Sequence, residues 1–145
     1  MLSPHDIDLF LRLFVATIFG WLIGLEREII GKTAGTRTFA LVSLGSTLFT
    51  IVSSEGFSGL LNQGTDPTRI ASQVLVGIGF IGAGVIIFRE GRVEGLTTAA
   101  TLWVTAALGL TLGRGMYALS FFTFLLTLLL LVATHWIHPE KWKKE

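Results

Sequence analysis

The stretch MYALSFFTFLLTLLLLVATHWI, from Met116 to Ile137, contains no Asp, Glu, Lys or Arg. A helical run of about 20 apolar residues is long enough to cross the hydrocarbon core of a bilayer. Trp136 and Trp142 lie at its end beside Lys141, Lys143 and Lys144, the usual aromatic and basic anchors of a membrane interface. The stretch therefore predicts a transmembrane helix.

Four more apolar blocks precede this one, separated by short segments with glycine and charge. Of the 145 residues, 51% are hydrophobic and 14% are charged, and the mean hydropathy is +0.70. We expect an all-α, polytopic membrane protein with a glycine-rich bundle in a single domain over residues 1–145. The five expected transmembrane helices cover about residues 7–25, 38–54, 68–88, 97–113 and 116–137.

The basic residues predict the orientation in the membrane. If the spans alternate, eight Lys and Arg residues fall on one side and three, Arg12, Arg69 and Arg114, fall on the other. Short loops rich in Lys and Arg stay in the cytoplasm. We therefore expect the N-terminus outside and the C-terminus inside. The leader before the first span has no Lys or Arg, which favours a retained span over a signal peptide.

Several functional classes find no support in the sequence. There is no cysteine, and the net charge of +1 gives no attraction to nucleic acid. The histidines, His5, His135 and His138, lie near the chain ends, so none can serve as the base of a catalytic site within the membrane. We expect no enzymatic activity, no cofactor and no nucleic-acid partner, and the sequence assigns no particular metal.

Small residues recur at helical spacing in three of the expected spans. Gly77-Ile-Gly-Phe-Ile-Gly82 matches a dinucleotide-binding pattern, but it lies inside an apolar run, where the backbone amides are already bonded. Helix packing is the better interpretation, since small residues let helices approach closely in lipid. The fifth span has no glycine and suits lipid or a second protomer, so we expect a homodimer. The residues expected to pack helices are Gly20, Gly24, Gly77, Gly79, Gly82, Gly84 and Gly109.

Candidate functional residues gather at the cytoplasmic end of the first span. Glu26, Arg27 and Glu28 stand there, and Glu28 continues the four-residue spacing of the small residues, which would aim it into the bundle. An ionisable group near membrane depth favours a cation, proton or partner site. An ion pair with Arg37 or Lys32 that anchors the helix end is the alternative.

Three polar residues mark the outer end of the third span. Asp66 can cap this helix, and the side chain of Arg69 can reach out so that its guanidinium lies at the membrane–water interface. Alternatively, Arg69 and Gln73 line an outward-facing vestibule. On the first span, Arg12 is placed to pair with Asp8 one turn earlier.

The fourth span has polar residues at its start and a tryptophan in its middle. Thr97 and Thr98 can cap the helix, whose positive end could receive Glu26 or Glu28. Trp103 lies away from the interface belt, so we expect it to be a packing anchor with its indole N–H bonded inside the bundle.

The motifs of the chain resemble those of the MgtC/SapB family of bacterial inner-membrane proteins over about residues 7 to 135. The resemblance is carried by Gly24-Leu-Glu-Arg-Glu, Gly31-Lys-x-Ala-Gly-x-Arg-Thr, Asp66-Pro67-x-Arg69, Gly77-Ile-Gly-Phe-Ile-Gly-Ala-Gly84 and Gly95-Leu-Thr-Thr-Ala-Ala-x-Leu-Trp103. It implies five transmembrane helices. The family motif residues fall here on Glu26, Arg27, Arg37, Asp66, Arg69, Gln73, Thr97, Thr98 and Trp103.

The resemblance also implies a role. It implies adaptation to low magnesium or stress, virulence in intracellular pathogens and, for one member, restraint of the ATP synthase, with direct magnesium transport doubtful. The chain ends at Glu145 without a soluble C-terminal domain, so a SapB-like short member is the expected comparison. We expect a protein that acts by contact with itself and with other membrane proteins. A small oligomeric cation or proton transporter or channel is the alternative.

Overall fold

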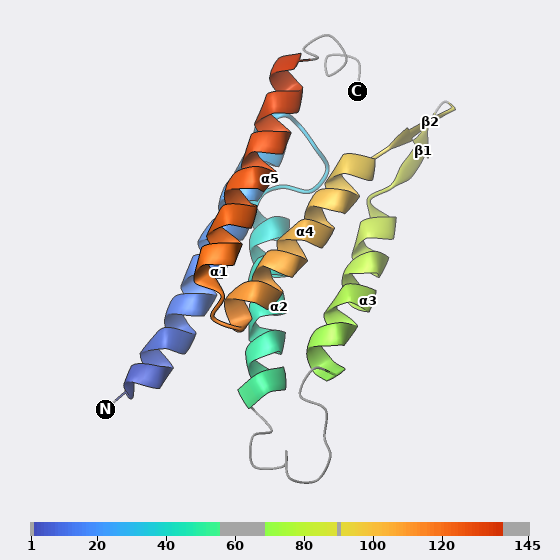
Figure 1. The fold of residues 1–145 in the computed structure, drawn as a ribbon. Helices are drawn as coiled ribbons and strands as arrows, with labels where there is room; N and C mark the ends of the chain where they lie inside the picture. The colour runs from blue at the N-terminus through green and yellow to red at the C-terminus, as the bar shows by residue number, and fades with distance from the viewer. Residues whose placement is uncertain (1, 56–68, 90, 138–145) are drawn as a thin grey trace.

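The computed structural model describes residues 2–55, 69–89 and 91–137, and it consists of helices and one short hairpin. The helices are α1 (Pro4–Ile29), α2 (Thr36–Glu55), α3 (Arg69–Gly84), α4 (Leu96–Gly113) and α5 (Tyr117–Ile137). Strands β1 (Ile87–Arg89) and β2 (Arg92–Glu94) form an antiparallel pair. Successive helices run in opposite directions, so that every connection lies at one of two ends (Figure 1). The helical class expected from the sequence is present, with a hairpin added.

Three of the helices are long and apolar enough to cross a membrane, namely α1, α2 and α4. Helix α3 and the part of α5 up to Ala133 are apolar but shorter. The 16 residues of α3 extend over about 24 Å at 1.5 Å per residue. This length is less than the hydrocarbon thickness of about 30 Å.

The hairpin explains why α3 is shorter than expected. The sequence favoured a span to Phe88, because the apolar run continues that far, but the helix ends at Gly84. Ile87 and Phe88 pair with Glu94 and Val93 instead, and Gly91 takes the positive φ of 78° at the turn. β-Branched and aromatic residues favour strands, so apolarity alone placed the helix end four residues too far.

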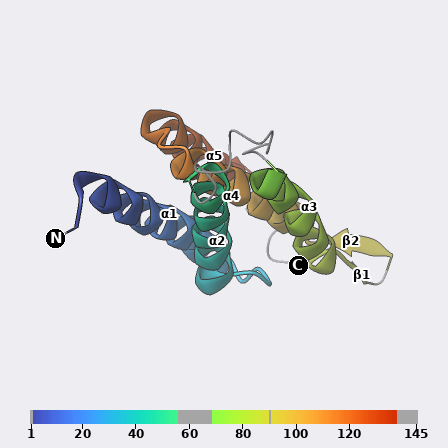
Figure 2. The same cartoon turned by 90° about the horizontal axis from the view of Figure 1, so that it is seen from below.

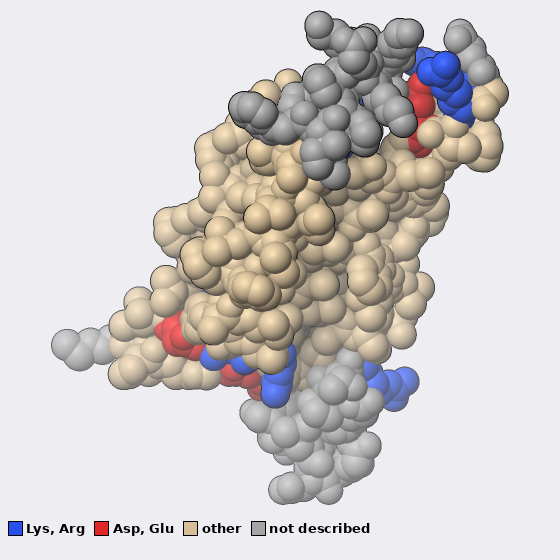
Figure 3. Space-filling view, turned by 45° about the horizontal axis from the view of Figure 1, so that its top comes forward, with Lys and Arg blue, Asp and Glu red and all other residues tan. Residues whose placement is uncertain are grey.

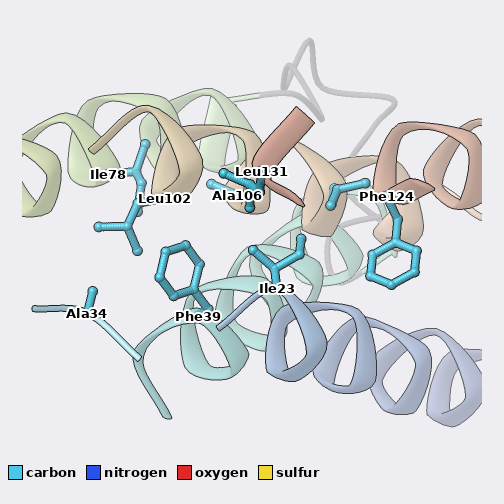
Figure 4. Packing of buried hydrophobic residues seen from close by; sticks show 9 residues of the cluster. Ile23, Ala34, Phe39, Ile78, Leu102, Ala106, Phe124 and Leu131 are labelled. Atoms are coloured by element: carbon cyan, nitrogen blue, oxygen red, sulfur yellow. The ribbon is translucent and has the colours of Figure 1, made fainter. Parts of the chain in front are cut away.

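Helix α2 lies near the centre of the bundle, between α1 on one side and α3 on the other (Figure 2). One cluster of buried side chains draws on all five helices (Figure 4). It includes Ile23 of α1, Phe39 of α2, Ile78 of α3, Leu102 and Ala106 of α4, and Phe124 and Leu131 of α5. The cluster therefore joins all five helices.

Three glycines lie where helix backbones meet. A Cβ added at Gly24 would lie 2.7 Å from the Thr36 Cα, and one at Gly20 would lie 2.8 Å from the Ser43 Cβ. A Cβ at Gly109 would lie 2.6 Å from the Ser43 carbonyl oxygen. Helices α1 and α4 are therefore in contact with α2 at separations that no larger side chain permits.

The glycines of α3 are placed differently from the expectation. Gly82 faces Ala99 of α4, where an added Cβ would make an ordinary contact at 3.7 Å. Around Gly77, Gly79 and Gly84, an added Cβ would meet nothing within 4 Å. Helix α3 lies at the edge of the bundle and buries only Ile78 and Gly82. The expectation that all four glycines pack helices within the chain is therefore wrong for these three.

Candidate functional site

On the face shown in Figure 3, the described Lys, Arg, Asp and Glu residues gather at the two ends of the bundle, with a band free of these residues between them. We call the end that carries β1 and β2 the hairpin end, and the opposite end, where α1 begins, the N-terminal end (Figure 1). Candidate residues from the sequence lie at both ends.

At the hairpin end, Glu28 is exposed and does not point into the bundle. Its Oε2 accepts a hydrogen bond from the Thr36 backbone N–H at 2.9 Å and another from the Thr36 hydroxyl at 2.6 Å. These bonds satisfy the free backbone donor at the start of α2. The expectation that Glu28 faces the interior is wrong, and its role is that of a cap supplied by the preceding helix.

The helical repeat explains which residue takes the interior position. With 3.6 residues per turn, position 28 is rotated by about 120° from Ala16, whereas position 27 is rotated by only about 20°. The buried residues of α1 are accordingly Ala16, Gly20, Ile23, Gly24 and Arg27. Arg27 therefore points into the bundle.

Arg27 is buried with incomplete pairing, and only 1% of the residue is exposed. Its Nη1 lies 3.4 Å from Oε2 of Glu26, while Nε and Nη2 have no hydrogen-bond partner among the described residues. Arg27 lies one turn beyond Ile23 on α1. Helix α4 runs antiparallel to α1, and its buried Thr98 lies one turn from Leu102 on the side of the hairpin end. Thr98 and Arg27 therefore occupy corresponding positions on the two helices. A buried guanidinium with free donors costs several kcal/mol.

The start of α4 also differs from the expectation. The residue before the helix is Gly95, with a φ of 87°, and no side chain caps the helix. Thr97 and Thr98 lie within the first turn instead, and the Thr97 carbonyl accepts a bond from the Thr101 hydroxyl at 2.7 Å. The two threonines are therefore not caps, and neither Glu26 nor Glu28 is bonded to them in the described structure.

Two further candidates have outward positions. Arg37 is exposed, and it has no ion pair within 4 Å in the part of the chain that the structure describes. Trp103 is 50% exposed, whereas the neighbouring Leu102 is fully buried. Successive residues of a helix point in directions about 100° apart, so Trp103 faces away from the bundle. The expectation that the indole is enclosed in the bundle is therefore wrong.

At the N-terminal end, Arg12 is the centre of a polar network. It forms the expected ion pair with Asp8, and its Nη1 donates to the Gly113 carbonyl at 2.8 Å. The Tyr117 hydroxyl donates to Asp8 at 2.6 Å, and Glu55 lies 3.8 Å from Arg12. The network joins α1, α2, α4 and α5. Only its Asp8–Arg12 pair had a helical spacing that the sequence could reveal.

Gln73 lies beside an open groove between α2 and α3, which we call the α2–α3 groove. Its volume is about 680 Å³. Arg69 is exposed at the first position of α3 and does not line the groove. Asp66 lies outside the described residues. The structure therefore brings Gln73 to a mostly apolar groove, rather than bringing Arg69 and Gln73 to a shared polar vestibule. The residues that line the α2–α3 groove are Thr38, Leu41, Val42, Gly45, Ser46, Phe49, Ile70, Gln73, Val74, Gly77, Ile78, Phe80 and Ile81.

A helical bundle with charged ends, an uncharged band between them and three helices of spanning length defines a membrane protein. Comparison with known protein families identifies the family. A model of the MgtC family matches residues 13–139, so the chain belongs to the MgtC family.

Three relatives illustrate the similarity. YhiD of Escherichia coli strain K12, named as a candidate magnesium transporter, is 49% identical over 131 residues, which cover 88% of this chain and 61% of YhiD. Protein SapB of Bacillus subtilis is 39% identical over 91% of this chain and 59% of SapB. Protein MgtC of Brucella abortus is 48% identical over 70% of this chain and 40% of that protein.

The chain spans about three fifths of the length of the first two relatives. SapB is thus longer than the stretch it shares with this chain, so it is not an example of a short relative. No solved structure shows significant similarity to the chain.

Proposed function

We propose that the chain is a five-span protein of the bacterial inner membrane, with the N-terminal end outside. We further propose that it supports adaptation to magnesium limitation or envelope stress through contacts with other membrane proteins, without catalysis. Its family membership and the names of its relatives motivate the link to magnesium. The ATP synthase is one partner that the resemblance suggests.

The observation that carries this proposal is that the described carboxylates other than Glu94 are bonded to or paired with protein groups. Glu28 caps α2, Glu26 lies against Arg27, and Asp8 is held by Arg12 and Tyr117. Glu55 is paired with His5 and lies near Arg12. Among the described residues, no three His, Asp or Glu side chains form a group suited to a metal ion. The arrangement favours a stable contact surface over a cation path.

Close packing within the bundle supports the same conclusion. Helices α1 and α4 contact α2 through glycines. The Thr47 hydroxyl between α2 and α4 is bonded to the carbonyls of Ser43 and Gly109, at 2.9 and 3.0 Å. Hydroxyls that are bonded to backbone carbonyls do not replace the hydration shell of a passing ion without rearrangement.

A small transporter or channel is the second candidate, because YhiD is named as a candidate magnesium transporter. In this case Glu26 or Asp66 would meet the cation.

One experiment separates the two functions. A strain that lacks this chain is grown at low magnesium with the wild-type chain or an empty vector, and the purified protein is tested for magnesium and proton flux in liposomes. We expect the wild type to restore growth and to give no flux above empty liposomes. Flux that is lost in Glu26→Gln or Asp66→Asn would establish the transporter instead. Failure to restore growth would reject the magnesium role.

A further inference from the structure

The outer face of α3 carries a ridge beside the α2–α3 groove. Phe80 is 84% exposed, although it lies at mid-length on an apolar helix and borders the groove. Gly77, one turn earlier, and Gly45 of α2 line the groove and have open space where a side chain would be. A large projecting ring thus stands next to a groove whose lining includes two glycines, Gly45 and Gly77.

We propose that this face is the interface of a homodimer, in which Phe80 of each copy enters the α2–α3 groove of the other. An interface formed around a two-fold axis must be self-complementary, with the same surface on both copies. A projecting ring and a groove on one face meet this requirement. The proposal does not depend on the role in magnesium limitation.

Depth in the membrane is consistent with this pairing. A two-fold axis along the membrane normal keeps every residue at the same depth in both copies, so Phe80 must enter the groove at its own level. The Ala71 N–H donates to the Ser53 hydroxyl at 3.3 Å, which sets the register of α2 against α3. Eight residues from this bond toward the hairpin end, the register brings Gly45 of the antiparallel α2 level with Gly79 of α3, beside Phe80. The groove is therefore at the level of the ring.

Gln73 indicates a second copy rather than lipid. Its side chain is exposed on the face of Gly77, Phe80 and Gly84, at spacings of four, three and four residues. No hydrogen-bond partner for this amide occurs within the described ranges. Acyl chains offer neither donors nor acceptors, whereas an amide both donates and accepts. Two copies of Gln73 that meet across the axis can therefore satisfy each other.

The outer face of α5 has none of these features. Leu129 and Leu130 are 61% and 63% exposed, and the helix has no glycine. A uniform surface of leucine and phenylalanine suits acyl chains. We therefore place the interface of the expected homodimer on α3 rather than on α5.

Cysteine cross-linking in native membranes tests the interface, because the chain has no cysteine of its own. Phe80→Cys is compared with Leu129→Cys, which lies a similar distance from the start of its own helix on the outer face of α5. With a short thiol-to-thiol cross-linking reagent, we expect Phe80→Cys to form a covalent dimer and Leu129→Cys to stay monomeric. Dimers through Leu129→Cys alone, or monomers in both variants, would overturn the proposal. A Phe80→Cys adduct with a different protein would also overturn it.

A matched pair of glycine variants distinguishes loss of the groove contact from general misfolding. With the cysteine moved to Gly84, on the same face of α3, the Phe80 ring is kept. In this background Gly77→Ile fills the groove, whereas Gly79→Ile lies outside the groove on the same helix, also in open space. We expect cross-linking to fall at least tenfold in the first variant and to persist in the second. Gln73→Leu should lower it by about threefold, the effect of one interhelical hydrogen bond in a membrane of about 0.6 kcal/mol. Equal cross-linking in both glycine variants would contradict the groove contact.

Discussion

Gly109→Val is expected to destabilise the bundle strongly. An added Cβ would lie 2.6 Å from the Ser43 carbonyl oxygen and 3.1 Å from the Thr47 backbone nitrogen. Backbone atoms within a helix cannot move aside, so α4 and α2 would have to separate. We expect a loss of about 3 kcal/mol, the upper end for overpacking. The measurement is thermal unfolding in detergent, followed by circular dichroism and size-exclusion chromatography.

The matched control is Gly79→Val, where an added Cβ meets nothing within 4 Å. Valine is slightly better than glycine in a helix, so stability should change by no more than about 0.5 kcal/mol. Equal melting temperatures for both variants would show that α2 and α4 are not in the close contact described.

Arg27→Met is expected to leave the protein folded while abolishing its support of growth at low magnesium. The guanidinium is buried, and two of its nitrogens lack partners. Methionine has a length similar to that of arginine and removes the cost of the two buried nitrogens without partners, which offsets the loss of the 3.4 Å contact with Glu26. A group retained at such a cost is a candidate for function. The two readouts are the melting temperature in detergent and the growth assay.

Arg92→Met serves as the control, because it removes the same charge from an exposed position at the hairpin end. We expect it to change neither readout strongly. Unfolding of Arg27→Met would assign Arg27 a structural role, and normal growth would remove Arg27 from the functional residues.

The sequence predicted helix positions better than helix contacts. Apolar blocks bounded by glycine and charge placed all five helices within four residues of their observed ends. The end of α3 was missed because Ile87 and Phe88 are as apolar in a strand as in a helix. Hydropathy does not distinguish these two structures.

The inward faces were harder to predict, because they depend on neighbours. A step of four residues rotates by about 40° more than a full turn, so the stripe through Ala16 reaches Arg27 rather than Glu28. Gly24 and Gly77 look alike in sequence, but only Gly24 has another helix of the chain against it. Which side of α3 is covered follows from its place at the edge of the bundle, which no local pattern encodes.

Labelling of single cysteines with a membrane-impermeant maleimide tests the central claim most directly. The account holds that the hairpin end and the N-terminal end lie on opposite sides of the membrane. Arg114→Cys should label in intact spheroplasts, whereas Thr33→Cys and Gly91→Cys should label only after the membrane is opened. Labelling of all three from the same side would contradict the account.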